Sequence, residues 1–434
     1  MGSRISICPQ AAPILLLPPE ITAKIFRQCL APDFICPSPH EAPLLLVQIC
    51  RQWRQIGLDT PDLWASIAFR GAEGCACCSS GNPRATKSLQ LLKIWLSRTR
   101  NHPLSLFLQS EDPTKAKKLM KIVKPYSDQW ENVFFHLPIS AHNHLHMSSF
   151  PRLKRLTLGG IGRADASTKP IIILAAPLLS WVSVSWIPHL KLASPANQLT
   201  TLDFRPFLDA TQAISFLQCC PNLVDLLSTV DVGVENLAPV ELPFLRSFAM
   251  RNEKMLPYLT APLLERLEIS ELDSKDIGAA GAAIAALVSR SSCDLKALSI
   301  PVTRTEVAQF QSLLQAANSI EHLELSHYWF CSQIQALRGI DDVLPQLKCL
   351  QIGGGPATDG EYRSLLDVLW WRKRHAALEL FQLAVDSVFR PSPAVMSEFH
   401  ELAEAGLQLH ITTVEGDRWS GREIVTLLDT RHPE

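Results

Sequence analysis

The sequence predicts an α/β repeat fold, in which a small N-terminal three-helix module is followed by an irregular, horseshoe-like solenoid of strand–helix units. Two observations support this prediction. Apolar residues recur at helical spacing in three short segments between residues 14 and 69, and a phrase of the form Pro-x-Leu-x-x-Leu-x-Leu recurs along the rest of the chain. The 434 residues are too many for one ordinary core and suit either several domains or one long repeat array.

The composition excludes several classes of protein. The chain is 47% apolar and 19% charged, which is enough to fill a core, so wholesale disorder is not expected. The net charge is −1, with 41 basic and 42 acidic side chains, so no overall field attracts nucleic acid or an anionic membrane. There is no signal peptide and no run of about 18 apolar residues, so we expect no membrane span. We expect the 12 cysteines to be reduced, in the cytosol or nucleus.

The three-helix module is predicted over residues 14–69. Its first helix begins at Pro18-Pro19-Glu20, because proline is tolerated in a first turn and an acidic residue suits the positive end of the helix dipole. A proline-containing loop comes next, and then a second helix with apolar residues from Leu45 to Ile56. Thr60-Pro61 starts a third short element. On periodicity alone, the module is either a partner-docking unit or a small helical cap on the C-terminal remainder of the chain.

The order of residues in this module resembles the F-box of fungal F-box proteins. The matching phrases are Leu17-Pro18-Pro19-Glu20-Ile21, Cys50-Arg51-Gln52-Trp53-Arg54 and Thr60-Pro61-Asp62-Leu63-Trp64. In the family, these positions carry Leu-Pro-x-Glu-Ile, a valine-cysteine-x-x-tryptophan helix and a closing Pro-x-Leu-Trp, in the same order. Ile49-Cys50 stands here for the usual Val-Cys. Many relatives carry a coiled-coil-like stretch before the box, and that stretch is either missing here or outside this sequence.

The resemblance implies that residues 14–69 dock onto the Skp-type adaptor of an SCF ubiquitin ligase, and through it onto a cullin scaffold. A pair of amphipathic helices with an apolar stripe is a normal helix-in-groove ligand, which agrees with that role. The residues implied to contact the adaptor are Leu17, Pro18, Pro19, Ile21, Ile25, Leu46, Ile49 and Trp53. For each of these residues, packing within the module is the alternative.

A linker at residues 70–86 and a leucine-rich-repeat-like region at residues 87–420 are predicted to come after the module. Successive phrases are anchored at Trp130, Leu153, Leu179, Leu199, Leu223, Leu245, Leu264, Leu295, Ile320, Leu347 and Leu380. Most of the intervals fit the roughly 20–29 residues of a leucine-rich repeat. Each phrase ends in a predicted strand with alternate side chains buried, and helices are predicted at 211–220, 277–290, 305–317 and 361–374. A compact α/β domain whose βα units happen to repeat is the alternative.

The chain shows no motif for covalent chemistry. It has no Gly-x-Ser-x-Gly elbow, phosphate loop or HExxH pair, so we expect no catalysis and no cofactor. The glycine-rich segments 159–162 and 353–355 are expected to be turns after strands. We expect no metal site at the cysteines of 75–78, which lack a partner pair at zinc spacing, or at the histidines of 142–146, which we expect in a solvated loop. The lysine-rich helix at 115–124 lacks the interleaved aromatic residues of a nucleic-acid site.

The sequence therefore predicts a substrate-recognition subunit of an SCF-type E3 ubiquitin ligase that binds a target protein on its repeat surface. Strand-end aromatic residues often line such surfaces, so Tyr328 and Trp329 are the predicted target contacts. Further aromatic residues in similar positions are Trp181, Trp186, Phe330, Trp370 and Trp371. The alternatives are a leucine-rich-repeat interaction scaffold without ubiquitin-ligase coupling, and an enzyme that uses the cysteines of 75–78 or the histidines of 142–146.

Overall fold

The computed structural model divides the chain into two compact units, which meet in the sequence at Leu199 and Thr200. The structure describes residues 13–32, 34–70, 85–162, 171–187, 190–192, 196–205, 210–229, 238–271, 277–301, 307–326, 334–338, 343–354, 356, 358–375, 377–386, 390–415 and 423–430.

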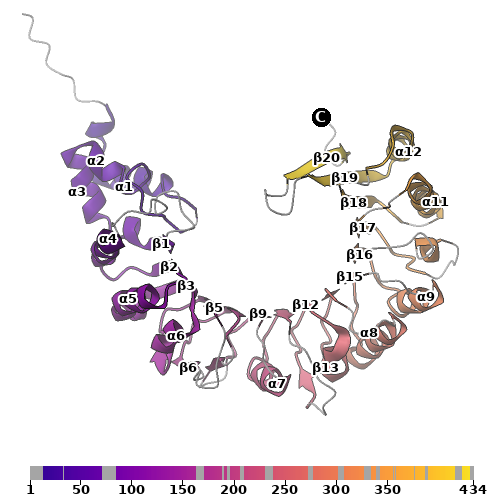
Figure 1. The fold of residues 1–434 in the computed structure, drawn as a ribbon, viewed down its shortest axis with the longest axis horizontal. Helices are drawn as coiled ribbons and strands as arrows, with labels where there is room; N and C mark the ends of the chain where they lie inside the picture. Colours follow the sequence, from indigo (N-terminus) through magenta and orange to yellow (C-terminus); the bar gives the residue numbers. More distant parts are fainter. Residues whose placement is uncertain are drawn as a thin grey trace, which may run out of the picture. The chain divides into compact units, whose positions relative to one another are not determined.

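The first unit begins with a helical module, which is followed by parallel strands that alternate with helices. The module contains the 3-10 helix η1 (Pro13–Leu16), helices α1 (Pro19–Gln28), α2 (Leu46–Ile49) and α3 (Arg51–Asp59), and the 3-10 helix η2 (Pro61–Trp64). Strands β1 (Ser66–Arg70), β2 (Leu104–Gln109), β3 (Trp130–Pro138), β5 (Arg155–Ile161) and β7 (Trp181–Ser185) pair in this order, all in parallel. Helices α4 (Ala85–Arg98), α5 (Pro113–Val123) and α6 (Ile139–His142) lie on one side of these strands (Figure 1).

Shorter elements complete the described part of the first unit. They are the 3-10 helices η3 (Lys124–Gln129) and η4 (Asn143–Leu145) and a three-stranded sheet of β4 (Ser148–Ser149), β6 (Ile171–Ala175) and β8 (Leu190–Leu192). No described helix packs against the other side of β1, β2, β3, β5 and β7 (Figure 1). The strand side chains on that side are open to solvent and to the segment after α1, where Phe34 contacts Phe107 of β2.

The second unit continues the pattern of parallel strands with helices on one side. Its strands are β9 (Thr201–Arg205), β10 (Asp225–Ser228), β12 (Ser247–Met250), β14 (Arg266–Ile269), β15 (Ala297–Pro301), β16 (His322–Ser326), β17 (Cys349–Gly353), β18 (Leu380–Asp386) and β19 (Gln408–Glu415). They pair in this order, and β20 (Glu423–Asp429) pairs antiparallel with β19. Its helices are α7 (Ala210–Gln218), α8 (Ile277–Ser291), α9 (Val307–Ala316), α11 (Asp359–His375) and α12 (Pro393–Glu404).

Small elements fill several connections of the second unit. They are η5 (Glu253–Tyr258), η6 (Gln335–Leu337) and the paired strands β11 (Val240–Glu241) and β13 (Leu259–Thr260). The leucine phrases build the cores of both units: nine successive anchors are at most 1% exposed, namely Leu153, Leu179, Leu199, Leu223, Leu245, Leu264, Leu295, Ile320 and Leu347. In β14, the strand after the anchor Leu264, every second side chain is buried, namely Leu267 and Ile269.

The predicted fold class, a three-helix module followed by a horseshoe-like leucine-rich-repeat solenoid, is wrong. The structure is an α/β chain in which fifteen strands, five in the first unit and ten in the second, belong to a large and mostly parallel sheet. The module itself runs into that sheet, because β1 begins within residues 14–69, at Ser66, and pairs with β2. The Pro-x-Leu-x-x-Leu-x-Leu phrase does not distinguish between the two folds. Any parallel strand that is followed by a crossover gives the same succession of a buried strand and a connecting segment.

Two arginines fasten helices of the second unit to neighbouring backbone. The guanidinium of Arg372 in α11 is buried and donates hydrogen bonds to the carbonyl oxygens of Leu337, Val343 and Leu344, at 2.7–3.0 Å. Arg290 in α8 donates in the same way to the carbonyl of Leu259. Burial lowers the pKa of Arg372 to about 10, so it stays a cation at neutral pH, satisfied by carbonyl dipoles.

Candidate functional site

The first helix of the module begins where the sequence predicts. The carbonyl of Pro18 accepts hydrogen bonds from the backbone N–H groups of Ile21 and Thr22, both at 3.0 Å, and from the Thr22 hydroxyl at 3.2 Å. Glu20 in the first turn and Arg27 in the last turn complement the helix dipole. Arg27 also forms an ion pair with Asp62 of η2, which ties this helix to the end of the module.

The second predicted helix is broken at Cys50. The apolar spacing from Leu45 to Ile56 predicts one helix, but the structure has α2 and α3 with Cys50 between them in extended conformation. The Cys50 Sγ accepts a hydrogen bond from the backbone N–H of Trp53 at 3.4 Å, and so caps α3. The Arg54 side chain then donates to the Val47 carbonyl at 2.9 Å, which holds the two short helices together.

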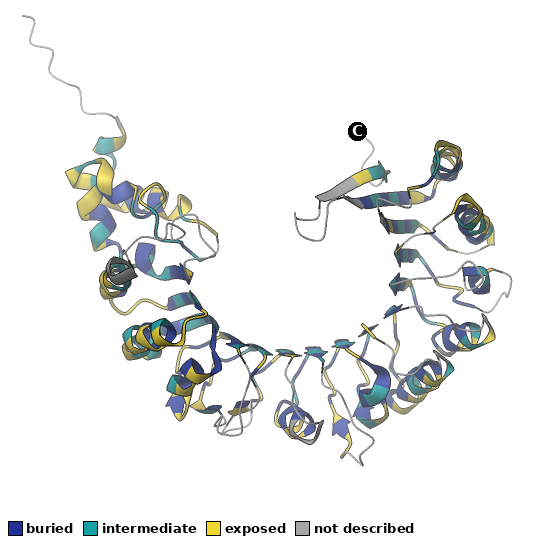
Figure 2. Cartoon of the chain, in the orientation of Figure 1, coloured by how far each residue is buried: buried dark blue, intermediate teal, exposed yellow. Residues whose placement is uncertain are grey.

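Six large apolar side chains of the module face solvent and form what we call the module surface. They are between 37% and 73% exposed, and they are Ile14, Leu16, Ile21, Ile25, Leu45 and Ile49. Figure 2 shows the corresponding exposed stretches along α1–α3. Gln52 donates to the Leu15 carbonyl at 3.1 Å, which brings η1 beside α3. So many exposed apolar side chains in one short segment are typical of a surface that a partner covers.

The structure separates the predicted adaptor contacts into exposed and packed residues. Pro18, Pro19, Ile21, Ile25 and Ile49 are exposed, and Leu17 is half-buried. By contrast, Leu46 is buried in the module, and Trp53 is half-buried with its ring edge-to-face with Phe26 at 5.0 Å between centroids. The sequence reasoning missed Ile14, Leu16 and Leu45, although the leucine run before Pro18 was a signal for Leu16.

The module is fixed to the rest of the first unit through Trp64, the last residue of the Pro-Asp-Leu-Trp phrase. Trp64 is fully buried and packs edge-to-face on Trp95 of α4, with 4.9 Å between ring centroids. The Trp95 indole N–H donates to the Trp64 carbonyl at 2.9 Å, and the Arg98 guanidinium lies 4.3 Å from the Trp64 ring centroid. These contacts give the closing phrase a structural role, because they hold the module in a defined position.

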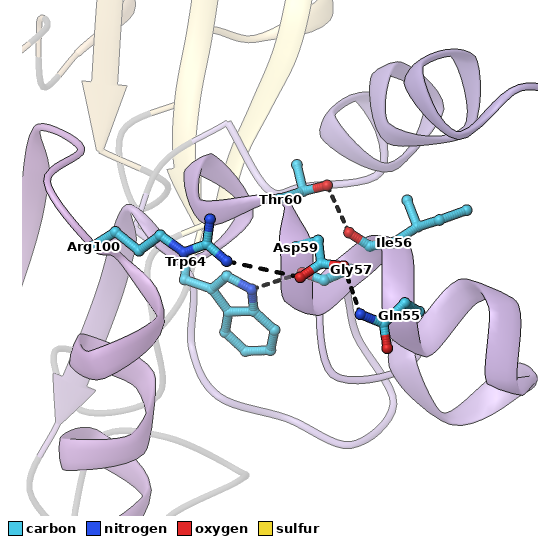
Figure 3. Close-up of polar contacts among 7 residues, drawn as sticks. All are labelled: Gln55, Ile56, Gly57, Asp59, Thr60, Trp64 and Arg100. Atoms are coloured by element: carbon cyan, nitrogen blue, oxygen red, sulfur yellow. Dashed lines mark hydrogen bonds and ion pairs between the residues drawn. The ribbon is translucent and has the colours of Figure 1, made fainter.

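Polar contacts at the end of α3 complete this junction (Figure 3). The Trp64 indole N–H donates to the Gly57 carbonyl at 2.9 Å, and the Thr60 hydroxyl donates to the Ile56 carbonyl at 2.6 Å. Asp59 accepts from Gln55 at 2.6 Å and forms an ion pair with Arg100 at 3.7 Å. Two carbonyls in the last turn of α3, those of Ile56 and Gly57, are therefore satisfied by side chains that come after the helix in the sequence.

His142, Gly159 and Gly160 are packed into the fold, whereas His144 is half-buried and His146 is exposed. His142 is buried and belongs to α6, so the three histidines of 142–146 do not alternate along an extended segment. In the part of the chain that the structure describes, no group of His, Cys, Asp and Glu side chains is arranged to hold a metal ion. Gly159 and Gly160 lie inside β5, where a Cβ on Gly160 would sit 2.5 Å from the Trp186 carbonyl oxygen. The expected turn is therefore wrong for these two glycines, which allow a close approach of backbones.

Several predicted residues lie outside the described residues. They include the predicted target contacts Tyr328 and Trp329, the cysteines of 75–78 and most of the linker predicted at 70–86. The domain boundaries at 14–69, 70–86 and 87–420 stay predictions. Among the cysteines that the structure describes, burial raises the pKa of the Cys220 thiol to about 12 and also raises that of Cys293, which disfavours the reactive thiolate.

No protein-family model matches the chain, and a search of curated proteins finds no match to its sequence. Within the described ranges, no helix is both long enough and apolar enough to cross a membrane. The function is therefore inferred from the residues of the chain and from their geometry.

Proposed function

We propose that this protein is the substrate-recognition subunit of an SCF-type E3 ubiquitin ligase. The helical module binds a Skp-type adaptor and through it a cullin scaffold, and another surface of the chain binds the target protein. In this proposal the protein itself catalyses no reaction and acts in the cytosol or nucleus. The three ordered phrases that resemble the fungal F-box support the proposal, together with the geometry of the module.

The observation that supports adaptor binding most directly is the module surface. Three of its six side chains, Ile21, Ile25 and Ile49, are residues that the resemblance assigns to adaptor contact, and Pro18 and Pro19 are exposed beside them in the sequence. Burying one such side chain stabilises a complex by up to about 1.5–3 kcal/mol, depending on how exposed it was. Several together match what an amphipathic helical ligand contributes in a hydrophobic groove.

Co-purification with a Skp-type adaptor tests the proposal. The tagged full-length chain is co-expressed with a fungal Skp-type adaptor, and we expect a stable complex in size-exclusion chromatography. Ile21→Asp and Ile49→Asp each place an unpaired carboxylate in the contact. We therefore expect each to weaken adaptor affinity by about a hundredfold or more, which corresponds to about 3 kcal/mol. Trp53 is unsuitable for this test, because it packs against Phe26 and its replacement would disturb the module.

Leu263→Asp is the matched control, because Leu263 is 45% exposed, close to the 41% of Ile21, but lies in the second unit. It should leave adaptor binding unchanged. Absence of a complex from a folded chain contradicts the proposal, as does an equal effect of all three substitutions. If the folded chain captures a partner protein but no adaptor, the interaction scaffold without ubiquitin-ligase coupling becomes the better description.

A further inference from the structure

A hollow of about 850 Å³ opens on the first unit, beside the helical module. The segment after α1 contributes Pro32 and Phe34 to its wall, and the first residues of β2, β3, β5 and β7 form its floor. This volume lies within the range of about 300–1,000 Å³ that is typical of ligand sites. All of the lining residues fall between Leu30 and Trp181, so the hollow belongs to the first unit alone.

The register of the parallel strands arranges the floor of the hollow in two rows. Residues paired across successive strands lie side by side, and their sequence neighbours Leu106, Val133 and Leu156 point to the buried side. The first row runs across four strands and consists of Ser105, Asn132, Arg155 and Trp181. The second row contains Phe134 and Thr157, which line the hollow, and Phe107, whose ring stacks on that of Phe134.

Aromatic rings give the hollow a flat apolar platform. The rings of Phe107 and Phe134 are stacked, with 4.6 Å between centroids and 5° between planes. The ring of Phe34, in the wall, lies tilted against that of Phe107, with 5.6 Å between their centroids. All three rings are only half-buried. Such a platform suits an aromatic or large aliphatic side chain of a ligand.

The charges around the hollow favour an acidic ligand. Its acidic side chains are already paired, since Glu131 binds Lys154 at 2.6 Å and Asp62 binds Arg27. Arg155 is exposed at the start of β5 and forms no ion pair with a described residue. Arg70 lies 5.0 Å from the Phe107 ring centroid, also without an acidic partner among the described residues. Among the described residues that line the hollow, the guanidinium of Arg155 is therefore unpaired and no carboxylate is unpaired. Guanidinium groups bind carboxylates well, and that of Arg70 lies beside Phe107.

The length of the floor favours a peptide over a small molecule. Neighbouring strands lie about 4.8 Å apart, so the row from Ser105 to Trp181 crosses three gaps and spans about 14 Å. An extended chain advances about 3.3 Å per residue, so about four or five residues cover this row. A ligand of that length reaches Arg155 and Trp181 at one end and the aromatic platform at the other.

We propose that this hollow binds a short, extended acidic peptide segment of a partner protein. One of its apolar side chains packs on Phe107 and Phe134, and one of its carboxylates pairs with Arg155. The identification of that partner as the target of ubiquitin transfer rests on the proposed function, whereas the binding of the peptide does not require the adaptor.

Selection from a phage-displayed library of random dodecapeptides on the full-length chain tests this inference. We expect enrichment of peptides that combine acidic residues with an aromatic or large aliphatic residue. A synthetic peptide from the enriched set should bind about tenfold or more weakly to Arg155→Glu, because the substitution places like charges together. Its binding should also weaken for Phe134→Ser, provided that this variant keeps the thermal melting temperature of the wild type within a few degrees.

Arg266→Glu is the matched control, because Arg266 is also an exposed arginine at the first position of a strand, β14 of the second unit. It should bind the selected peptide like the wild type. No enrichment, enrichment of basic peptides, or equal binding to Arg155→Glu and the wild type would each overturn the inference. The same preparations are assayed for adaptor binding. A chain that binds the adaptor but no acidic peptide then contradicts only this inference, and the reverse result contradicts only the proposed function.

Discussion

Acidification is predicted to destabilise the first unit through His142. This residue of α6 is fully buried, and its Nε2–H donates to the carbonyl of Gly159 in β5 at 3.0 Å. Burial lowers the pKa of His142 from 6.5 to about 4, more than its backbone hydrogen bonding raises it. Because the pKa is lower in the folded state, the unfolded chain binds more protons between these values. The free energy of unfolding is therefore unaffected by protonation of His142 above about pH 6.5, and it decreases as the pH falls toward 4.

The difference between 6.5 and about 4 corresponds to about 3 kcal/mol of stability once both states are protonated. Between pH 7 and pH 5, His142 alone should cost about 2 kcal/mol. We propose to measure the free energy of unfolding in urea at both pH values by tryptophan fluorescence, for the wild type and for His142→Gln, which keeps a donor but does not titrate. The wild type should lose about 2 kcal/mol more than the variant. Equal losses in the two proteins would refute the reasoning.

Three further predictions concern buried groups. Arg372→Met leaves three buried carbonyl oxygens without donors, so it should lower the free energy of unfolding by about 3–5 kcal/mol in chemical denaturation. Arg372→Lys should lose less, and a loss under about 1 kcal/mol for Arg372→Met contradicts the prediction. Trp95→Phe removes the hydrogen bond to Trp64 and should cost about 1–3 kcal/mol in the same assay, whereas unchanged stability would mean that this junction is not important. Cys220 should resist alkylation by iodoacetamide at pH 8 in the folded chain while the exposed Cys219 reacts, as mapped by mass spectrometry, and equal modification of both is the opposing result.

The strands were predictable from the sequence, and their assembly was not. The apolar spacing of a single strand is a local property of the sequence. In one repeat, for example, the predicted buried side chains are all buried, namely Leu264, Leu267 and Ile269. The fold class failed because the same alternation arises in any parallel sheet with crossovers, and only the pairing of distant strands decides between arrangements. The C-terminal strand β20 shows the same limit. It pairs with β19 through hydrogen bonds between segments on either side of a loop, and local apolar spacing does not reveal such a pairing.

The candidate sites were predictable only where one short segment determines them. Ile21 and Ile49 are exposed as adaptor contact requires, whereas Leu46 is buried, since apolar spacing does not say which face of a short helix meets its neighbours. The break between α2 and α3 at Cys50 was not predicted, because no glycine or proline lies at that position. The hollow was not predicted, because it brings together residues from six separate segments whose proximity depends on strand register.

Hydroxyl-radical footprinting of the full-length chain, with and without a Skp-type adaptor, tests the central claim most directly. The module surface is the face that the adaptor is proposed to cover, so oxidation of Ile14, Leu16, Ile21, Ile25, Leu45 and Ile49 should fall in the complex. Oxidation of Phe244 and Leu263, which are exposed apolar residues of the second unit, should stay unchanged. Adaptor binding that leaves the module surface as reactive as in the free chain would contradict the proposed role of the module.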